Sequence, residues 1–274
     1  MRAAIFNGPH SVEVGERPDP VISAPTDAVV RVVLSCVCGS DLWYYRGDSP
    51  HDLGPIGHEF IGVVDEVGPE VRGIAKGDFV IAPFVYCDGT CANCLAGVTS
   101  QCVQGGGFGN HGIDGGQGEA VRVPLAGSTL VRVPGSGHSD ETMRSLLALS
   151  DVMCTGHHAA VSAGVKPGSV VAVVGDGAVG LCGVIAAQRL GAARIIALSR
   201  NPSRQKLATA FGAEEHLVIH DAIQEVDRAL IQHMTRPENH GAIQGAIDYL
   251  TDALLSHLAY EEQELVEPLA RFGF

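Results

Sequence analysis

The feature that most constrains the fold of this chain is an apolar run that leads directly into a glycine-rich turn. The run Ser169-Val-Val-Ala-Val-Val174 precedes the turn Gly175-Asp-Gly-Ala-Val-Gly180, and residues 179–190 have helical spacing. A second apolar run covers residues 194–198. Because a continuous Val run is typical of a parallel strand covered on both faces, this order predicts one β-α-β unit.

The same turn predicts a dinucleotide-binding site. Gly175, Gly177 and Gly180 read G-x-G-x-x-G directly after a strand and directly before a helix, which is the context that a dinucleotide loop requires. Glycine lets the backbone turn sharply and approach the pyrophosphate, whose charge then meets the N-terminus of the helix. Because the motif lies between a predicted strand and a predicted helix, we predict that this turn binds a dinucleotide cofactor.

The end of the second apolar run favours NADP over NAD. A protein that binds NAD commonly has a carboxylate here for the ribose 2'-hydroxyl, but this chain has Ser199 and Arg200, with Arg204 one helical turn beyond. No carboxylate repels a 2'-phosphate, and two guanidinium groups can bind it. The alternative interpretation is that these arginines are solvated at the start of a helix.

Composition changes along the chain predict three domains. Short alternating runs at 28–34 and 61–67 indicate an irregular β domain, and the Ala- and Leu-rich stretch 139–162 is helical, with Ser139 as its N-cap. A helix at 204–211 and a strand at 216–219 extend the β-α-β unit, and an acidic amphipathic region with a loop at 235–239 follows. The expected domains are a β-rich domain at 1–150, a β-α-β domain at 151–221 and a helical tail at 222–274.

Four cysteines lie close together in the first domain. Cys87, Cys91, Cys94 and Cys102 have the spacing x3, x2 and x7, and four thiolates this close can surround one tetrahedral Zn2+. The alternative, free core cysteines, fits poorly because the loop has few apolar residues. Such a site has only protein ligands, so we expect it to be structural.

A second set of metal-binding residue types is spread along the chain. Cys38, His58 and Asp151 are suited to Zn2+, and three protein ligands leave a fourth position for water or an alcohol oxygen. Each residue alone is more often solvated or hydrogen-bonded than a metal ligand. Only their combination predicts a catalytic metal site.

Composition excludes several function classes. The chain has 274 residues, 46% hydrophobic, and a net charge of −13, which argues against nucleic acid or an anionic membrane surface as the main partner. No signal-peptide or membrane-spanning stretch is found, so a cytoplasmic location is the default expectation. In that compartment tight cysteine clusters indicate metal ligands rather than disulfides.

These residues together resemble the medium-chain, zinc-dependent alcohol dehydrogenase family. The longest match is Gly57-His58-Glu59-x2-Gly62-x5-Gly68-x2-Val71, which is similar to the zinc signature of that family, and the resemblance covers roughly residues 1–220. It implies an α/β fold with a GroES-like β catalytic domain, a truncated Rossmann parallel sheet and a helical tail. It also implies hydride transfer between a small alcohol or aldehyde and a nicotinamide cofactor.

The resemblance implies roles for individual residues. Cys38, His58 and Asp151 look like the ligands of a catalytic zinc, and Glu59 looks like a neighbour that approaches the metal during ligand exchange. Cys154 is the rival of Asp151, because the family has its third ligand, Cys or Asp, shortly before the position of Thr155-Gly156.

Ser40 and Asp41 complete the implied site. The hydroxyl of Ser40 matches the group that hands the substrate proton away, and Asp41 looks like a partner of His58. Zinc would act as a Lewis acid on the alcohol oxygen while a hydride passes to the nicotinamide. Trp43 stands where some relatives have a relay histidine, so the proton route beyond Ser40 is left open.

Two departures from the family pattern limit these expectations. The cysteine loop has x3 rather than x2 between Cys87 and Cys91, which lengthens one turn. The resemblance also ends before the later strands of the family's cofactor domain, so a zinc- and cofactor-binding protein with little turnover is the alternative function. We expect either the helical tail or a second copy of the chain, in a homo-oligomer, to cover the open sheet edge.

The end of the chain weakly resembles one helix of a hemerythrin-like iron-binding bundle. His257, Glu261 and Glu262 stand in an apolar helical pattern at 253–269. One helix cannot supply a di-iron site, which needs ligands from four helices. A plain amphipathic helix is therefore the preferred interpretation, and an iron- or oxygen-binding protein is the second rival.

Overall fold

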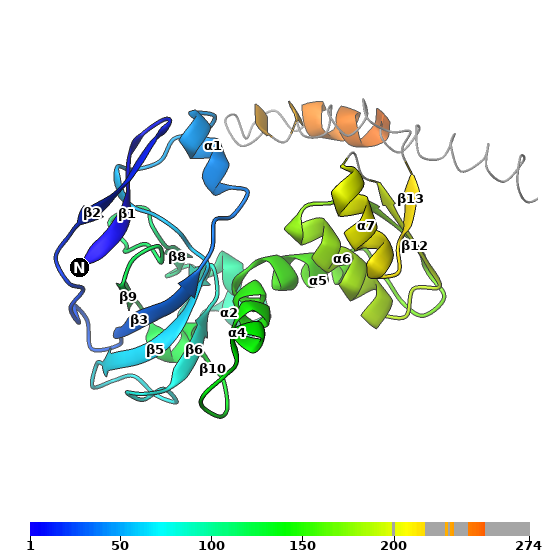
Figure 1. The fold of residues 1–274 in the computed structure, drawn as a ribbon. Coiled ribbons are helices and arrows are strands. Elements are labelled where there is room, and N and C mark those ends of the chain that lie inside the picture. Colours follow the sequence, from blue (N-terminus) through cyan, green and yellow to red (C-terminus); the bar gives the residue numbers. More distant parts are fainter. Residues whose placement is uncertain (199–200, 217–227, 230, 233–240, 250–274) are drawn as a thin grey trace, which may run out of the picture. The chain divides into compact units, whose positions relative to one another are not determined.

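The computed structural model describes residues 1–198, 201–216, 228–229, 231–232 and 241–249. The chain forms two compact units, Met1–Cys154 and Thr155–Phe274 (Figure 1). The division lies after the expected boundary at 150/151, so Asp151 belongs to the same unit as Cys38 and His58. Along the described part of the chain, no helix has both the length and the apolar character needed to cross a membrane.

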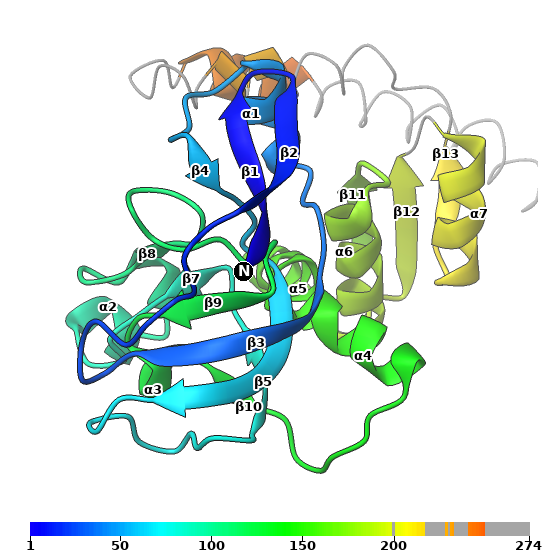
Figure 2. The ribbon, with the colours of Figure 1, turned by 60° about the vertical axis from the view of Figure 1, so that its left-hand side comes forward.

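The first unit is built around a five-stranded antiparallel sheet with the order β10-β6-β5-β3-β9. Its strands are β3 (Ala28–Ser35), β5 (Phe60–Val67), β6 (Phe79–Ala82), β9 (Ala120–Val123) and β10 (Val131–Arg132). In Figure 2 β9, β3 and β5 lie side by side in this order. The alternating runs that predicted an irregular β domain thus form β3 and β5, two adjacent inner strands of this sheet.

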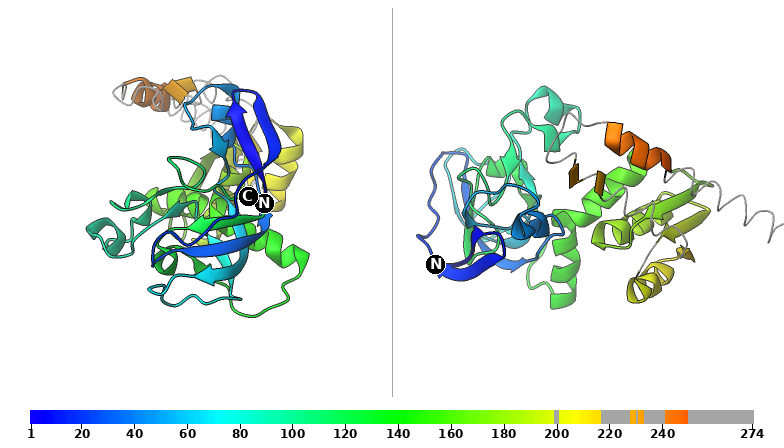
Figure 3. Two further views of the ribbon diagram at one scale, coloured as in Figure 1. Left: turned by 90° about the vertical axis from the view of Figure 1, so that its left-hand side faces the viewer. Right: turned by 90° about the horizontal axis from the view of Figure 1, so that it is seen from above.

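Two smaller sheets complete this unit. One has the order β2-β1-β4, and its β1-β2 hairpin is dark blue in Figure 3. The other pairs β7 with β8. The strands are β1 (Arg2–Gly8), β2 (Ser11–Glu16), β4 (Gly54–Pro55), β7 (Val85–Tyr86) and β8 (Gly106–Gly107).

The core of the first unit lies under the five-stranded sheet. Val30 of β3 and Phe60 and Val64 of β5 are almost completely buried, together with Val80 and Val121 of the flanking strands. The β3 and β5 backbones approach so closely that a Cβ on Gly62 would lie 2.2 Å from the carbonyl oxygen of Arg31. A glycine is therefore required where the two central strands meet.

Short helices connect these strands and lead out of the unit. They are α1 (Asp41–Arg46), α2 (Ala92–Leu95), η1 (Thr99–Gln101), α3 (Ala126–Thr129), α4 (Asp140–Leu147), η2 (Ala148–Ser150) and α5 (Val152–Ser162). The expected helical stretch at 139–162 is confirmed as α4, η2 and α5. Its predicted N-cap is also confirmed, because the Ser139 side chain accepts a hydrogen bond of 3.2 Å from the backbone N–H of Thr142.

The described part of the second unit is a β-α-β arrangement. The parallel sheet has the order β11-β12-β13, with α6 between the first two strands and α7 between the next two. The elements are β11 (Val170–Val174), α6 (Ala178–Arg189), β12 (Arg194–Leu198), α7 (Pro202–Ala210) and β13 (Glu214–His216). The predicted β-α-β unit is confirmed. The third strand begins two residues before the expected 216–219, of which residues 217–219 lie outside the described residues.

One expectation about β11 is wrong. Its Val run predicted burial on both faces, but Val170 is 64% exposed and Val174 is 38% exposed. Val171 and Val173 point the other way and pack with Val184 of α6. Since alternate side chains of a strand face opposite sides, α6 covers one face of this edge strand only.

The helical tail predicted for 222–274 is described only in part. Residues 241–249 are helical. The loop expected at 235–239 and the hemerythrin-like helix expected at 253–269 lie outside the described residues.

Candidate metal centres

The first candidate centre joins four side chains from three separate segments of the first unit. Cys38 precedes α1, His58 and Glu59 directly precede β5, and Asp151 lies between η2 and α5. One ligand atom from each of these four residues lies within 4.8 Å of the others. Three of them are the residues predicted as catalytic ligands, and Glu59 is the predicted neighbour.

The spacing of these atoms fits a tetrahedral Zn2+. Oδ2 of Asp151 lies 3.6 Å from Nε2 of His58 and 3.9 Å from Sγ of Cys38. Donor atoms bound to one zinc at about 2.0 to 2.3 Å are about 3.3 to 3.8 Å from one another. A thiol, an imidazole and a carboxylate at these distances can therefore hold the ion with only small shifts.

Asp41 orients the imidazole of His58. Its Oδ1 lies 3.5 Å from Nδ1 of His58 and accepts a 2.9 Å hydrogen bond from the hydroxyl of Tyr44. Its Oδ2 accepts a 2.9 Å hydrogen bond from the backbone N–H of Cys38. Asp41 thereby links the two segments that carry Cys38 and His58 and turns Nε2 toward Asp151.

The electrostatics of this centre favour a cation. Burial lowers the pKa of His58, but hydrogen bonds to Asp151 and Cys38 and the charge of Asp41 outweigh it and raise this pKa to about 10. The carboxylates of Asp41 and Asp151 thus favour a positive charge beside them. A cation bound there would meet the same preference.

Glu59 and Cys36 form a pair that the sequence reasoning missed. The thiol of Cys36 donates a hydrogen bond to Oε2 of Glu59. Glu59 as a residue is only 2% exposed, and this burial raises the pKa of its carboxyl group. Oε1 of Glu59 is buried without a hydrogen-bond partner among the described residues. The sequence signal that could have drawn attention to Cys36 is its position two residues before Cys38.

Gln117 was also missed. Its Nε2 donates a 3.1 Å hydrogen bond to the carbonyl oxygen of Cys36 and lies 3.5 Å from Oδ2 of Asp41. It thus ties the loop before α1 to the segment that precedes β9. No local pattern in the sequence marks such a contact, because it joins residues far apart in the chain.

Ser40 and Cys154, the two other residues considered for this centre, differ in the hydrogen bonds that their side chains make. Ser40 is the N-cap residue of α1, yet its side chain makes no capping hydrogen bond, so the hydroxyl is not used to hold the helix. Cys154 is exposed, and its Sγ donates to the carbonyl oxygen of Leu149 at 3.2 Å. The structure therefore groups Asp151, and not Cys154, with Cys38 and His58.

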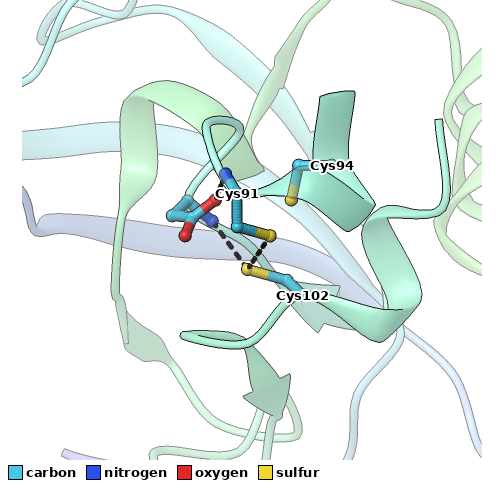
Figure 4. A group of neighbouring side chains, drawn as sticks. Cys91, Cys94 and Cys102 are labelled. Atoms are coloured by element: carbon cyan, nitrogen blue, oxygen red, sulfur yellow. Dashed lines mark hydrogen bonds between the residues drawn. The ribbon is translucent and has the colours of Figure 1, made fainter. Parts of the chain in front are cut away.

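The second candidate centre lies in the cysteine loop after β7. Cys91 directly precedes α2 as its N-cap residue, Cys94 belongs to α2, and Cys102 follows η1. The three thiols are turned toward one another in Figure 4, and Sγ of Cys91 lies 3.9 Å from Sγ of Cys102. The fourth member of this group, whose ligand atoms all lie within 4.8 Å of one another, is Asp88.

Cys87 was predicted as the fourth ligand but is not a member of this group. Its side chain is only 6% exposed, and its Sγ lies 3.6 Å from the carbonyl oxygen of Ser128. Its backbone N–H donates to Oγ1 of Thr129 at 3.1 Å. Cys87 thus packs toward α3, although its thiol also interacts with the thiols of Cys94 and Cys102, and the next residue, Asp88, lies beside the three grouped thiols.

The loop thiols differ in how readily they ionise. Backbone N–H groups of Cys94 and Val103 lower the pKa of the Cys91 thiol. Burial and hydrogen bonding with Cys102 and Cys91 raise the pKa of Cys94 to about 12. Neighbouring thiols resist simultaneous ionisation without a cation, and a bound metal removes that resistance.

In the glycine loop of the second unit, the backbone at Gly180 lies very close to the backbone at Gly175. Gly175 has a φ of +98°, and a Cβ on Gly180 would lie only 2.1 Å from the carbonyl oxygen of Gly175. A Cβ on Gly177, the N-cap residue of α6, would meet no described atom within 4 Å. Gly180 is thus needed for packing, whereas the space over Gly177 is open.

Of the three residues expected near the adenosine ribose, only Arg204 is described. Its Nη1 lies 3.5 Å from Oδ1 of Asp176, inside the glycine loop, and its side chain is 54% exposed. Ser199 and Arg200 lie outside the described residues. Arg204 therefore reaches the loop that is expected to hold the cofactor.

Comparisons with known proteins show which family this chain is similar to. Residues 24–135 match the family model of the alcohol dehydrogenase GroES-like domain. A medium-chain reductase/dehydrogenase of Acremonium sp is 40% identical over 221 residues, which are 78% of this chain and 74% of the relative. Zinc-type alcohol dehydrogenase B of Aspergillus flavus is 39% identical and matches 78% of this chain.

A solved structure extends the likeness to the fold. The alcohol dehydrogenase of Thermus sp. ATN1 matches with a TM-score of 0.74 and 33% identity, over 83% of this chain and 67% of that protein. Several relatives are longer than this chain. It spans 51% of the Aspergillus flavus protein and 55% and 57% of the next two curated relatives.

Proposed function

Since this chain belongs to the medium-chain, zinc-type alcohol dehydrogenase family, we propose that it serves in zinc-dependent hydride transfer between an alcohol or aldehyde and NADP(H). The observation that carries the proposal is the convergence of Cys38, His58 and Asp151 from three segments. Three protein ligands leave one position open, as a catalytic zinc site requires.

The donor set decides which ion fits. One thiolate, one imidazole and one carboxylate suit Zn2+ better than Mg2+ or Ca2+, which take oxygen ligands. We assign the three direct bonds to Cys38 Sγ, His58 Nε2 and Asp151. Glu59 would offer a further carboxylate oxygen to the ion, because its Oε1 has no hydrogen-bond partner among the described residues.

The surrounding residues position the reaction. Bound Zn2+ supplies Lewis-acid polarisation of the substrate oxygen. Asp41 holds the His58 ring, and Tyr44 holds Asp41 by its 2.9 Å hydrogen bond. We assign to the Ser40 hydroxyl the relay of the proton that the alcohol loses: Oγ would accept that proton while its own hydroxyl proton passes to solvent, because helix capping does not occupy this side chain.

The cofactor is assigned to the second unit. The backbone around Gly177 has room for a pyrophosphate group at the N-terminus of α6. The guanidinium of Arg204 is near this loop and attracts the additional phosphate of NADP. We therefore propose NADP rather than NAD as the preferred cofactor.

Single-turnover kinetics tests the proposal. Zinc-loaded protein is mixed with NADP and a series of small primary alcohols, and the absorbance of NADPH is followed. We expect formation of NADPH that is lost in Asp151→Asn and retained in the matched variant Cys154→Ser. If zinc and NADP both bind but no alcohol or aldehyde gives hydride transfer, the protein is a binding protein and the proposal is wrong.

A further inference from the structure

We propose that His51 is a positioning residue of the catalytic metal site and acts on it through Tyr44. The imidazole ring of His51 fixes the phenol ring of Tyr44, and the hydroxyl of Tyr44 holds Asp41. Asp41 in turn orients the imidazole of His58. This inference rests on the proposed function, because the role of His58 as a ligand belongs to that proposal.

His51 and Tyr44 form a close ring stack. Their ring centroids lie 3.9 Å apart, and the angle between the ring planes is 9°. Phe6 of β1 meets both rings with its edge, at centroid distances of 5.1 Å from Tyr44 and 5.7 Å from His51. Stacked and edge-to-face pairs are both favourable arrangements of rings. The phenol ring is therefore held by a strand and by the segment between α1 and β4.

The hydroxyl of Tyr44 passes this constraint to Asp41. It donates a 2.9 Å hydrogen bond to Oδ1 of Asp41, the same oxygen that lies 3.5 Å from Nδ1 of His58. Burial and the charge of Asp41 raise the pKa of Tyr44, so the hydroxyl keeps the proton that it donates. Asp41 is only 5% exposed, so water has little access to replace this donor. The direction of the Asp41 carboxylate thus depends on where the phenol ring lies.

His51 acts by its ring and not as a metal ligand. Neither group of candidate metal ligands among the described residues includes His51. Its Nε2 is buried and has no hydrogen-bond partner in the described part of the chain, while the ring also has a hydrogen bond with the backbone of Gly109. Burial lowers the pKa of His51, which favours the neutral imidazole. A neutral ring in this place contributes mainly the face that it presents to Tyr44.

A double-mutant cycle tests the path from His51 to Asp41. The probe is Co2+, and its binding to the catalytic site is measured as the thiolate charge-transfer absorbance that Cys38→Ser removes. Asp41→Asn should lower the Co2+ affinity of this site by about 10-fold or more, and Tyr44→Phe and His51→Ala should each lower it by about 3-fold or more. In the double variant of Tyr44→Phe with His51→Ala the loss should equal that of Tyr44→Phe alone, because His51 acts through the hydroxyl.

Matched variants separate the ring face from general stability. His51→Phe keeps a stacking face and should retain the Co2+ affinity within about 2-fold. His10→Asn removes a ring that lies 5.5 Å from the ring of Tyr45, the next residue of α1, and should leave the affinity unchanged. Asparagine suits this position because His10 has a φ of +62°. The absorbance that persists in Cys38→Ser comes from the loop thiols and is the internal reference.

Several outcomes would overturn the inference without affecting the proposed function. Losses that add in the double variant would show that His51 and Tyr44 act independently. Equal losses in His51→Phe and His51→Ala would show that the stacking face is not what matters. A parallel loss of the loop absorbance in His51→Ala would assign His51 a role in stability alone.

Failure of the proposed function gives a different result. If the cobalt affinities follow the expected cycle but no hydride transfer occurs, the positioning role of His51 stands and the proposed reaction is wrong. If no cobalt absorbance depends on Cys38, the catalytic metal site and the role of His51 are both wrong.

Discussion

The carboxylate of Asp151 lies 3.6 Å from Nε2 of His58, although the two residues come from distant parts of the chain. Asp41 faces the opposite ring nitrogen at 3.5 Å. The imidazole is thus held between two carboxylates, one of which orients it while the other shares its proposed metal. This arrangement is the basis of the first prediction.

Asp151→Asn should weaken binding of the catalytic zinc and lower single-turnover hydride transfer, each by at least about 10-fold, because it removes an anionic ligand. Cys154→Ser should change both by less than about 2-fold, since its thiol faces Leu149. Zinc analysis and stopped-flow absorbance measure the two effects. The opposite ranking of the two variants would make Cys154 the ligand.

Removal of the loop zinc should destabilise the first unit. Metal binding to Cys91, Cys94 and Cys102 contributes to folding free energy, so a strong chelator should lower the melting temperature measured by circular dichroism. Cys91→Ser should melt at a lower temperature before chelation and respond less to the chelator. Identical melting curves for all four samples would remove the structural role of the loop.

Two glycines of the cofactor loop should respond differently to an added methyl group. Gly180→Ala places a Cβ 2.1 Å from a backbone oxygen and should destabilise the second unit by about 1 to 3 kcal/mol. Gly177→Ala meets no described atom, so stability should be retained while NADP affinity falls. Denaturant unfolding and fluorescence titration test this pair. Retained NADP affinity in Gly177→Ala would place the pyrophosphate elsewhere.

Arg204→Ala should lower NADP affinity by about 10-fold or more and leave NAD affinity nearly unchanged, because a charge-assisted hydrogen bond to the 2'-phosphate is lost. The matched control is Asp176→Asn, which removes the partner that Arg204 contacts at 3.5 Å but keeps the arginine. Equal losses for NADP and NAD in Arg204→Ala would indicate that Arg204 acts on the loop and not on the 2'-phosphate.

Acid should weaken the contact between Arg2 and Glu119. Backbone and side-chain hydrogen bonds from Arg2 lower the pKa of Glu119 below its ordinary value of 4.5. A lowered folded-state pKa contributes stability above pH 4.5, and that contribution is lost as the pH falls through the folded-state value. NMR titration of the Glu119 carboxyl should show the shift, and Arg2→Gln should reduce it. An unchanged titration in Arg2→Gln would assign the whole effect to other groups.

The sequence alone determined features that depend on local contacts. The Val run, the glycine turn and the following helical segment predict β11, α6 and β12 within one or two residues, because strand period, turn chemistry and helix capping act over a few positions. Ser139 as N-cap is of the same kind. The grouping of Cys38, His58 and Asp151 rested instead on their residue types and on the family resemblance, since no local rule joins residues so far apart.

Tertiary structure decided which way individual side chains face. Val170 and Val174 are exposed because α6 covers the opposite face of β11. The Val run itself does not indicate which face of the strand the helix covers. Cys87 and Asp88 are neighbours in sequence, and their spacing favoured the cysteine as a ligand. Contacts with Ser128 and Thr129, 41 and 42 residues away, bury Cys87 against α3, and Asp88 lies within the group of thiols. A metal site requires suitable residue types whose ligand atoms also point toward one common position. Only the tertiary structure determines where each side chain points.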